Sequence, residues 1–486
     1  MRRWPAGAPV RGSRSRVDRL PLTAGQMVAA TGGRLVHGRE DEEIGNISID
    51  SRTVATGEFF VAIRGERFDG HRFVSDALRR GARGALVDTV TAGDEEAARA
   101  HDAILIAVGD TTRGLQAIAR DVRRRAGTRL VAITGSAGKT TTKEITAEFL
   151  SARYRVFRNK GNFNNHIGLP LSLLELRSRP DVAVVELGMN HSGELRTLVG
   201  IAEPEVRVWT NVGDAHAGFF PSADAIADAK AEVLEAARPG DLVVANADDA
   251  RVTARIAAFA GRTLTFGIDH AADVQATEVK DEGLDGTSAR VRTPAGEIAL
   301  HTPLLGLGNL ANVLASIAVA VDFEVPLADI ASRAASLHPA SRRGELLRLP
   351  GGLTLIDDSY NSSPSALRQA LRTLRTASGS ARKIAVLGEM LELGGHATRL
   401  HEECGAAAAA AGLDLLITVG GEPARALAAA AIAAGMPAAA VVATGSSAEA
   451  AAVAIERTRP GDLVLVKGSR GIGTDAMVDR LKAEFA

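Results

Sequence analysis

Short apolar runs alternate with longer amphipathic segments along most of the chain from Leu22 onward. The clearest unit starts at Leu130–Ile133, an apolar run of the kind that forms a buried parallel strand. A tight glycine turn follows, and apolar or small side chains then recur at the spacing of a helix face. This pattern predicts a central parallel sheet, with further strands over 181–186, 206–211 and 241–246.

Two further α/β regions flank this centre. Residues 22–108 alternate helix, strand, turn and strand, and a helix is predicted over 111–125. The segment 262–302 has short alternating strands and turn dipeptides, which predicts an antiparallel insertion packed on the central region. The C-terminal region repeats strand and helix regularly, which indicates a parallel sheet of Rossmann type. Its strands are predicted over 353–358, 383–389, 414–420 and 462–468.

The length of 486 residues is too great for one core, and about three domains are expected. We therefore predict an α/β fold in three domains. Residues 1–20 are Arg-rich but lack the apolar core of a signal peptide, so we expect a disordered extension. The domains that follow are predicted over 21–109, 110–337 and 338–486.

The composition narrows the class of protein. Apolar residues make up 46% of the chain and charged residues 24%, as in ordinary globular proteins. The net charge of −1 provides no basic field for nucleic acid, and no apolar run approaches the roughly 18–20 residues that span a bilayer. The single cysteine, Cys404, rules out an intramolecular disulfide and suits a reducing compartment. We expect a cytoplasmic monomer that neither binds nucleic acid nor spans a membrane.

The turn after Leu130–Ile133 has the features of a phosphate-binding loop. Glycines let backbone N–H groups approach a polyphosphate, and the helix N-terminus and a lysine add positive charge. The following threonine can place its hydroxyl on a magnesium ion. The common form GxxxxGK[ST] would need glycine at Ile133, so an ordinary turn with a surface lysine is the alternative. The predicted triphosphate site comprises Gly135, Ser136, Ala137, Gly138, Lys139, Thr140 and Thr141.

Polar side chains also follow the neighbouring strands. Glu186 ends one strand and His216 closely follows another, and ligands bind at the carboxyl ends of strands in open parallel sheets. Together they favour a functional site beside the phosphate loop. By itself, Lys230 indicates a helix lysine with a solvated head. The four asparagines within 158–168 suit either structural turns or a polar ligand such as a sugar or a diphosphate.

Two polar clusters lie in the N-terminal region, Asp50-Ser51-Arg52 and Asp69-Gly70-His71. Their spacing alone favours turn and capping chemistry, with His71 on the surface. In the C-terminal region the first strand is followed by DDSYN rather than GxGxxG, which argues against a dinucleotide cofactor.

Taken together, these motifs resemble those of the Mur ligases, the ATP-dependent amide-bond synthetases of peptidoglycan precursor assembly. The loop Thr134–Thr141 resembles the family's TGxxGKTT, whose shorter glycine spacing accounts for Ile133. GNFNNHIGLP is similar to GNxNNxIGxP, and the DSR and DGH clusters resemble signatures of a UDP-binding N-terminal domain. The resemblance extends from Leu22 to the C-terminus.

The resemblance implies ATP and Mg²⁺ as cofactors. Glu186 and His216 match magnesium-binding positions, and Lys230 falls on a lysine that is carbamylated in related ligases and supports a metal. Asn309 resembles an adenine-contacting asparagine, although this chain has GLGN where the family usually has GRHN. Arg343 resembles the arginine of GRxE, near the phosphates, although Ser341-Arg342 depart from the family's Pro-Gly.

The resemblance also assigns further binding positions. Asp358 would hold the ribose or base of ATP from the C-terminal domain. The UDP-linked substrate would be bound by Ser51, Arg52, His71, Asn162 and Asn165.

Within the family, DDSYNSSP, GEMLELG with His401-Glu402, and VKGSR are similar to the branch that adds D-alanyl-D-alanine. The DNPR-like motif of the diaminopimelate-adding branch is not found in the sequence. The implied reaction joins D-alanyl-D-alanine to UDP-N-acetylmuramoyl-tripeptide through an acyl phosphate. The alternatives are the diaminopimelate-adding branch, a folylpolyglutamate synthase-like ligase, and a P-loop nucleotide switch that regulates a partner.

Overall fold

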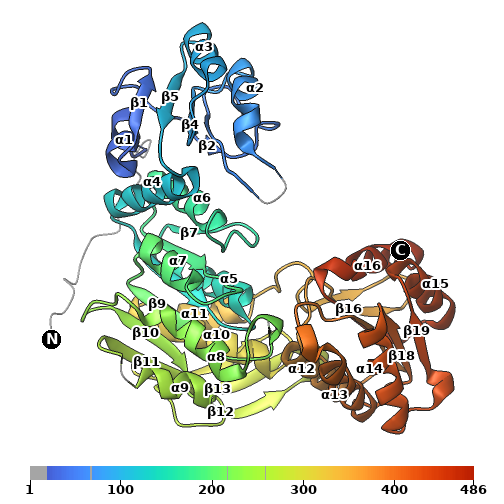
Figure 1. Ribbon diagram of the computed structural model, residues 1–486. Coiled ribbons are helices and arrows are strands. Elements are labelled where there is room, and N and C mark those ends of the chain that lie inside the picture. Colours follow the sequence, from blue (N-terminus) through green and yellow to red (C-terminus); the bar gives the residue numbers. More distant parts are fainter. Residues whose placement is uncertain (1–18, 66–67, 216, 258) are drawn as a thin grey trace. The chain divides into compact units, whose positions relative to one another are not determined.

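The chain folds into two compact units of α/β structure (Figure 1). The first unit spans Met1–Arg129 and Asn159–Ala183, and the second spans Leu130–Arg158 and Val184–Ala486. The first unit is therefore discontinuous, because it takes up the asparagine-rich segment that follows the phosphate loop. The domain boundaries expected at 109/110 and 337/338 stay predictions. This computed structural model describes residues 19–65, 68–215, 217–257 and 259–486.

The first unit is built on a five-stranded sheet in the order β1-β5-β4-β3-β2, in which only β1 is antiparallel to its neighbour. An apolar cluster that includes Phe60, Leu78 and Leu105 fills one side of this sheet. The predicted helix over 111–125 is confirmed as α4. The strands are β1 (Arg34–His37), β2 (Ile47–Ser48), β3 (Phe59–Val61), β4 (Gly84–Val87) and β5 (Ile104–Ala107), and the helices are α1 (Ala24–Thr31), α2 (Val74–Arg79), α3 (Ala92–Ala100), α4 (Thr111–Ala126) and α6 (Gly168–Leu174).

The ordered part of the first unit begins before Leu22. The backbone N–H of Leu20 donates to the carbonyl of Arg177, and Arg177 Nε donates back to the carbonyl of Leu20 at 2.9 Å. Leu20 is also buried, so it belongs to the first unit and not to the predicted extension over residues 1–20. Residues 1–18 lie outside the described residues.

The second unit contains a nine-stranded sheet in the order β14-β13-β12-β11-β10-β9-β6-β8-β7. Strands β6, β9 and β10 run parallel, as the sequence predicts, so their carboxyl ends meet at one edge. The strands are β6 (Arg129–Thr134), β7 (Val156–Arg158), β8 (Val182–Glu186), β9 (Val206–Trp209), β10 (Leu242–Asn246), β11 (Arg262–Gly267), β12 (Val274–Asp281), β13 (Thr287–Thr293) and β14 (Gly296–Thr302), and the helices are α5 (Lys139–Leu150), α7 (Glu194–Ala202), α8 (Ala223–Ala231), α9 (Ala250–Ile256), α10 (Leu307–Asp322) and α11 (Leu327–Ala334).

The segment 262–302 differs from its prediction in one respect. Strands β12, β13 and β14 are antiparallel as expected, but β11 pairs in parallel with both β10 and β12. The segment therefore extends the central sheet and is not a separate insertion packed on it. The physical reason is that β10 would otherwise leave its backbone N–H and C=O groups unpaired at an open edge.

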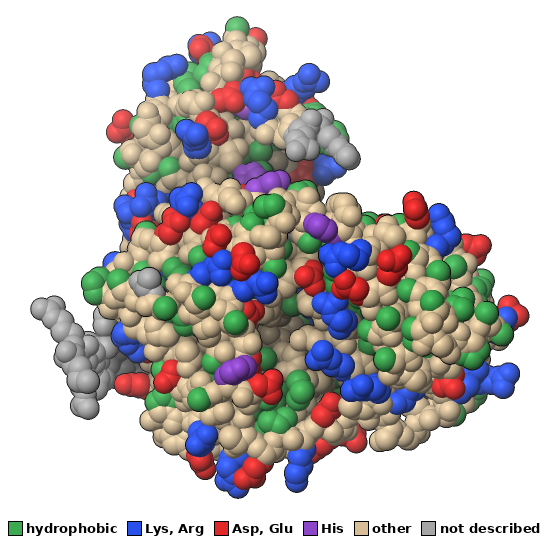
Figure 2. Space-filling view, turned by 60° about the horizontal axis from the view of Figure 1, so that its bottom comes forward, with side chains coloured by type: hydrophobic (Ala, Val, Ile, Leu, Met, Phe, Trp, Pro, Cys, Tyr) green, Lys and Arg blue, Asp and Glu red, His purple; other side chains and the backbone are tan. Residues whose placement is uncertain are grey.

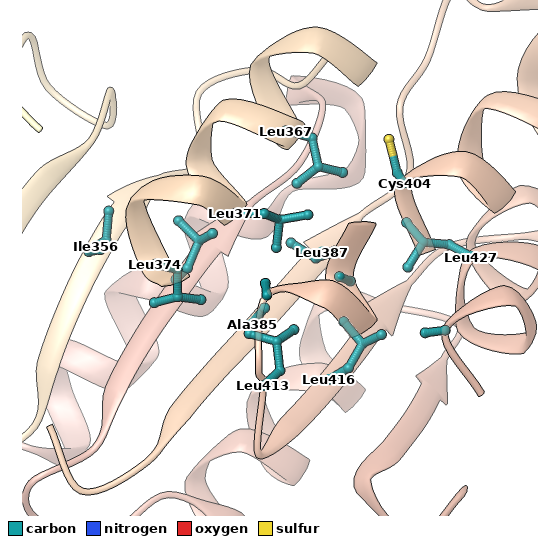
Figure 3. Close-up of a cluster of buried hydrophobic side chains, with 14 of the residues drawn as sticks. Ile356, Leu367, Leu371, Leu374, Ala385, Leu387, Cys404, Leu413, Leu416 and Leu427 are labelled. Carbon is teal, nitrogen blue, oxygen red and sulfur yellow. The ribbon is translucent and has the colours of Figure 1, made fainter. Parts of the chain in front are cut away.

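The C-terminal part of the second unit is a six-stranded sheet in the order β15-β16-β20-β17-β18-β19. The four predicted strands are confirmed, whereas β15 and β19 were not predicted. Leucines of α12 pack with leucines of the sheet and the buried Cys404 on one face (Figure 3). A second apolar cluster covers the other face. The elements are β15 (Glu345–Arg348), β16 (Thr354–Asp358), β17 (Lys383–Gly388), β18 (Leu415–Val419), β19 (Val441–Thr444), β20 (Leu463–Lys467), α12 (Pro364–Thr376), α13 (Ala397–Ala410), α14 (Glu422–Ala433), α15 (Ser447–Arg457) and α16 (Thr474–Glu484).

The surface carries charges of both signs. Figure 2 shows acidic and basic side chains interspersed over the face in view, in line with the net charge of −1. Among the described residues, no helix is long and apolar enough to cross a bilayer.

Candidate functional site

The predicted phosphate loop lies between β6 and α5, with Gly138 as the residue that caps the helix. Gly135 and Gly138 adopt positive φ angles of 149° and 82°. A Cβ at Gly135 would overlap Thr210 Oγ1, and a Cβ at Gly138 would overlap Asn312 Oδ1. Only glycine is accommodated at these two positions without displacing Thr210 or Asn312.

The loop is held by the segment that follows β9. The Thr210 hydroxyl donates to the carbonyl of Ala137 at 2.7 Å, and the Ala137 N–H donates to Asn211 Oδ1 at 2.9 Å. The Gly213 N–H donates to Ser136 Oγ at 2.8 Å. Sequence reasoning missed Thr210 and Asn211, although their position at a strand end beside the loop was a usable signal.

Lys139 is the first residue of α5, and its Nζ donates to the carbonyl of Gly135 at 2.9 Å. Burial lowers the pKa of Lys139, the negative charge of Glu186 opposes this shift, and the positive charge of Arg343 adds to it. The structure therefore brings Lys139, at the start of α5, and Arg343, from the loop before β15, close enough for their charges to interact.

Thr140 and Glu186 form the candidate magnesium position. The Thr140 hydroxyl donates to Glu186 Oε2 at 2.7 Å, and Glu186 is buried at the end of β8. Among the described residues no three His, Cys, Asp or Glu side chains converge on a metal position, and His216 lies outside those residues. Magnesium typically uses one or two protein oxygens together with phosphates and water. The paired hydroxyl and carboxylate fit that requirement.

Lys230 lies in the last turn of α8 and is 2% exposed, so the expectation of a solvated head is wrong. Burial lowers its pKa well below the usual value, and the positive charge of Lys139 lowers it further. Its Nζ has no hydrogen bond or ion pair within the described part of the chain. The burial of Lys230 depends on the elements that pack around α8, and the local sequence pattern carries no information about them.

The two asparagines of α10 have different surroundings. Asn309 Nδ2 donates to the carbonyl of Leu305 at 2.9 Å, and Asn309 Oδ1 accepts from Asn312 Nδ2 at 3.2 Å. Asn312 Oδ1 in turn accepts from the Thr142 hydroxyl of α5 at 3.2 Å. Asn312 therefore contacts the helix of the phosphate loop.

Of the predicted C-terminal residues, Arg343 lies just before β15 and Asp358 is the last residue of β16. The Arg343 guanidinium lies over the Tyr360 ring, 4.2 Å from its centroid. Lys467 Nζ donates to Asp358 Oδ2 at 2.6 Å and to the carbonyl of Asn361 at 3.1 Å. Lys467 is buried and was seen in the sequence only as part of the VKGSR motif, so its pairing with Asp358 is a new feature of the site.

In the first unit, His71 is held on both ring nitrogens. Its Nδ1 lies 2.7 Å from Asp69 Oδ1, and the Asp88 N–H donates to Nε2 at 3.0 Å. These partners fix the orientation of the ring. The expectation of a surface histidine is therefore wrong, because its side chain is only 11% exposed. Arg52 is exposed, and its Nη2 forms an ion pair with Asp50 Oδ2 at 2.7 Å. These two residues flank Ser51.

The asparagine-rich loop belongs to the first unit. Asn165 Oδ1 accepts the N–H groups of Ile167 and Gly168 at 3.2 and 2.8 Å, so it caps the start of α6. Asn162 is exposed. The side-chain oxygen of Asn165 therefore has the structural role in a turn that was the alternative to ligand binding. The side-chain amide of Asn162 is accessible.

Three family models match consecutive parts of the chain. They are described as the Mur ligase family catalytic domain (residues 43–123), the Mur ligase middle domain (133–320) and the Mur ligase glutamate ligase domain (342–470). A UDP-N-acetylmuramoyl-tripeptide–D-alanyl-D-alanine ligase of Bacillus subtilis is 32% identical over 91% of this chain and 94% of its own. The chain belongs to the Mur ligase family.

Solved structures of Mur ligases give the same result. A crystal structure of MurF from Acinetobacter baumannii matches with a TM-score of 0.86 and 31% identity, over 96% of this chain and 100% of the other. The MurF ligase of Thermotoga maritima in complex with ADP matches with a TM-score of 0.79 and 28% identity, over 90% and 97%. The α/β fold with parallel-rich sheets is therefore the Mur ligase fold.

Proposed function

We propose that this chain is an ATP-dependent ligase that joins D-alanyl-D-alanine to UDP-N-acetylmuramoyl-tripeptide. The relatives that match over most of its length carry the name of that activity. The observation that carries the proposal is the phosphate loop, where Lys139, Arg343 and the pair Thr140–Glu186 surround a backbone that only glycine can form.

The charges at this loop suit the first chemical step. A peptide carboxylate that attacks the γ-phosphate of ATP must overcome repulsion between two anions, which requires concentrated positive charge. Lys139 and Arg343 supply such charge, because the positive charge of Arg343 helps to lower the pKa of Lys139 at the loop. The acyl phosphate that forms is then attacked by the amine of the dipeptide, and phosphate leaves as the amide bond closes.

Thr140 and Glu186 would hold Mg²⁺, together with His216 and a carbamylated Lys230. When bound, the ion would neutralise the phosphate oxygens. The lowered pKa of Lys230 supports carbamylation, because the neutral amine is the form that reacts with carbon dioxide. The resulting anion would face the charge of Lys139.

For the remaining residues we propose binding roles. Asn309 would contact the adenine, and Asp358, paired with Lys467, would hold the ribose or the base. The UDP-linked peptide would be bound by the first unit, and ATP and UDP-linked substrates make the cytoplasm the expected location. The residues concerned are Ser51, Arg52, His71, Asn162 and Asn165.

The test is phosphate release by the purified chain with UDP-N-acetylmuramoyl-tripeptide, ATP and Mg²⁺. We expect turnover only when D-alanyl-D-alanine is present, because the acyl phosphate needs an amine acceptor to complete the reaction. Turnover with diaminopimelate and the dipeptide precursor would favour the neighbouring branch. A rate of nucleotide hydrolysis that does not depend on any acceptor would contradict ligase activity and favour a nucleotide switch.

A further inference from the structure

Helix α12 of the C-terminal sheet has two chemically different faces. Leu367, Leu371 and Leu374 pack into the apolar cluster on the sheet (Figure 3). The polar residues Ser365, Arg368, Gln369, Arg372, Thr373 and Thr376 recur at spacings of three and four, which places them along one side of the helix. We call five of them, all except Arg372, the α12 polar stripe.

The α12 polar stripe lies directly against glycines of the nucleotide-binding part. A Cβ at Gly213 would come within 2.9 Å of Ser365 Oγ, and a Cβ at Gly308 within 2.5 Å of Gln369 Oε1. A Cβ at Gly306 would overlap Thr373 Oγ1. Side chains of the stripe therefore approach glycine backbone at three places, where an added side chain would require these contacts to shift.

Polar contacts accompany this approach. Arg368 Nη2 lies 3.0 Å from Asp214 Oδ2, and both side chains are about one-third exposed. At the far end of the helix, the Thr376 hydroxyl donates to Asp281 Oδ2 at 3.1 Å. Ser365 Oγ is buried and has no hydrogen-bond partner within the described part of the chain.

The contacted backbone belongs to two walls of the phosphate loop. Gly213 donates its N–H to Ser136 Oγ, and Asn211, two residues earlier, holds Ala137. Gly306 begins α10, the helix whose Asn312 faces Gly138. One helix of the C-terminal sheet thus supports both segments that shape the nucleotide site.

We propose that Arg368 and Gln369 are positioning residues, which hold the 211–214 and 306–309 segments in the arrangement that binds the nucleotide. Neither residue acts on the substrate directly. The proposal rests on the nucleotide site described above, but it is independent of which acceptor the ligase uses. It assigns to the α12 polar stripe a share in nucleotide affinity, beyond its share in folding.

The experiment measures ADP binding to the full chain by titration calorimetry. Arg368→Ala should weaken binding about fivefold, the upper range for a partly exposed ion pair. Arg368→Ala combined with Gln369→Ala should weaken it about tenfold or more, since two supported segments are then released. Arg372→Ala is the matched control, because Arg372 is an exposed arginine on the same side of the helix that makes no hydrogen bond or ion pair among the described residues, and it should leave the affinity within about twofold.

A kinetic readout separates positioning from folding. The variants should raise the KM for ATP more than the KM for the UDP-linked substrate, while the melting temperature stays near that of the wild type. If Arg368→Ala does not fold, Gln369→Ala alone decides, with an expected loss of about threefold in ADP affinity.

The proposal is overturned if the double variant binds ADP as the wild type does, or if Arg372→Ala weakens binding equally. A wild-type chain that binds ADP but shows no acceptor-dependent turnover would instead reject the proposed function and leave the role of α12 standing.

Discussion

The pKa values of Lys230 and Lys139 are both lowered, but nearby charges act on the two lysines in different ways. Lys139 has its shift opposed by Glu186, whereas the pKa of Lys230 is lowered both by burial and by Lys139 itself. An amine that loses its proton easily becomes a nucleophile, and carbamylation converts it into an oxygen ligand of opposite charge. The pair would then attract where it now repels.

This difference predicts the behaviour of Lys230→Ala. Activity should fall by about a hundredfold or more, as for loss of a group that stabilises charge in the transition state. Added short carboxylic acids should restore part of it, because they can occupy the place of the carbamate. The assay is phosphate release with and without formate or acetate. Lys280→Ala, at an exposed position of β12, serves as the control and should keep full activity. Normal activity of Lys230→Ala without an added carboxylic acid would contradict the carbamate hypothesis.

At the scale of elements, the phosphate loop depends on glycines whose backbone no other residue adopts without strain. Gly135 combines a φ of 149° with overlap of any Cβ with Thr210 Oγ1. Gly412, after α13, also has a positive φ of 70°, but a Cβ there would meet nothing within 4 Å. These two glycines separate the effect of backbone strain from the effect of displacing the loop.

We therefore expect Gly135→Ala to weaken ATP binding by about tenfold or more, because the added Cβ would displace the loop from Thr210. Gly412→Ala should lower the free energy of unfolding by about 1 kcal/mol through left-handed strain and leave binding unchanged. Calorimetric titration with ADP and urea unfolding measure the two quantities. Equal affinity of Gly135→Ala and wild type would show that the loop tolerates a side chain.

Sequence patterns predicted the elements whose own residues determine them. The loop Thr134–Thr141 and the four C-terminal strands were found, because apolar runs and glycines record burial and turns locally. Strands β15 and β19 are short and only partly buried, so they lack that signal. The burial of Lys230 and the contact of Asn312 with the loop depend on partners far along the chain.

At the scale of the whole molecule, α4 belongs with the small sheet that precedes it. Its buried side chains include Leu115, Ile118 and Val122. Arg125 on the same helix donates to Gln26 at 3.1 Å and to the carbonyl of Pro21 at 2.7 Å, so α4 also fastens the segment around α1. The predicted boundary at 109/110 would remove all of these contacts from the N-terminal domain.

Two fragments test this boundary. Both fragments lack residues 159–183 of the unit. Residues 19–129 should still unfold at higher urea than residues 19–109, as followed by circular dichroism, because the shorter fragment exposes the apolar surface that α4 covers. Coincident transitions of the two fragments would support the boundary at 109/110 instead.

The discontinuity of the first unit has a consequence for how the protein is made. Residues 159–183 complete this unit, yet the ribosome must first produce β6, the phosphate loop and α5, which belong to the second. At about 5–20 residues per second, that intervening stretch occupies the exit of the ribosome for a few seconds. The nascent chain therefore carries an incomplete first unit while the phosphate loop emerges. The first unit can be completed only after this part of the second unit has been synthesised.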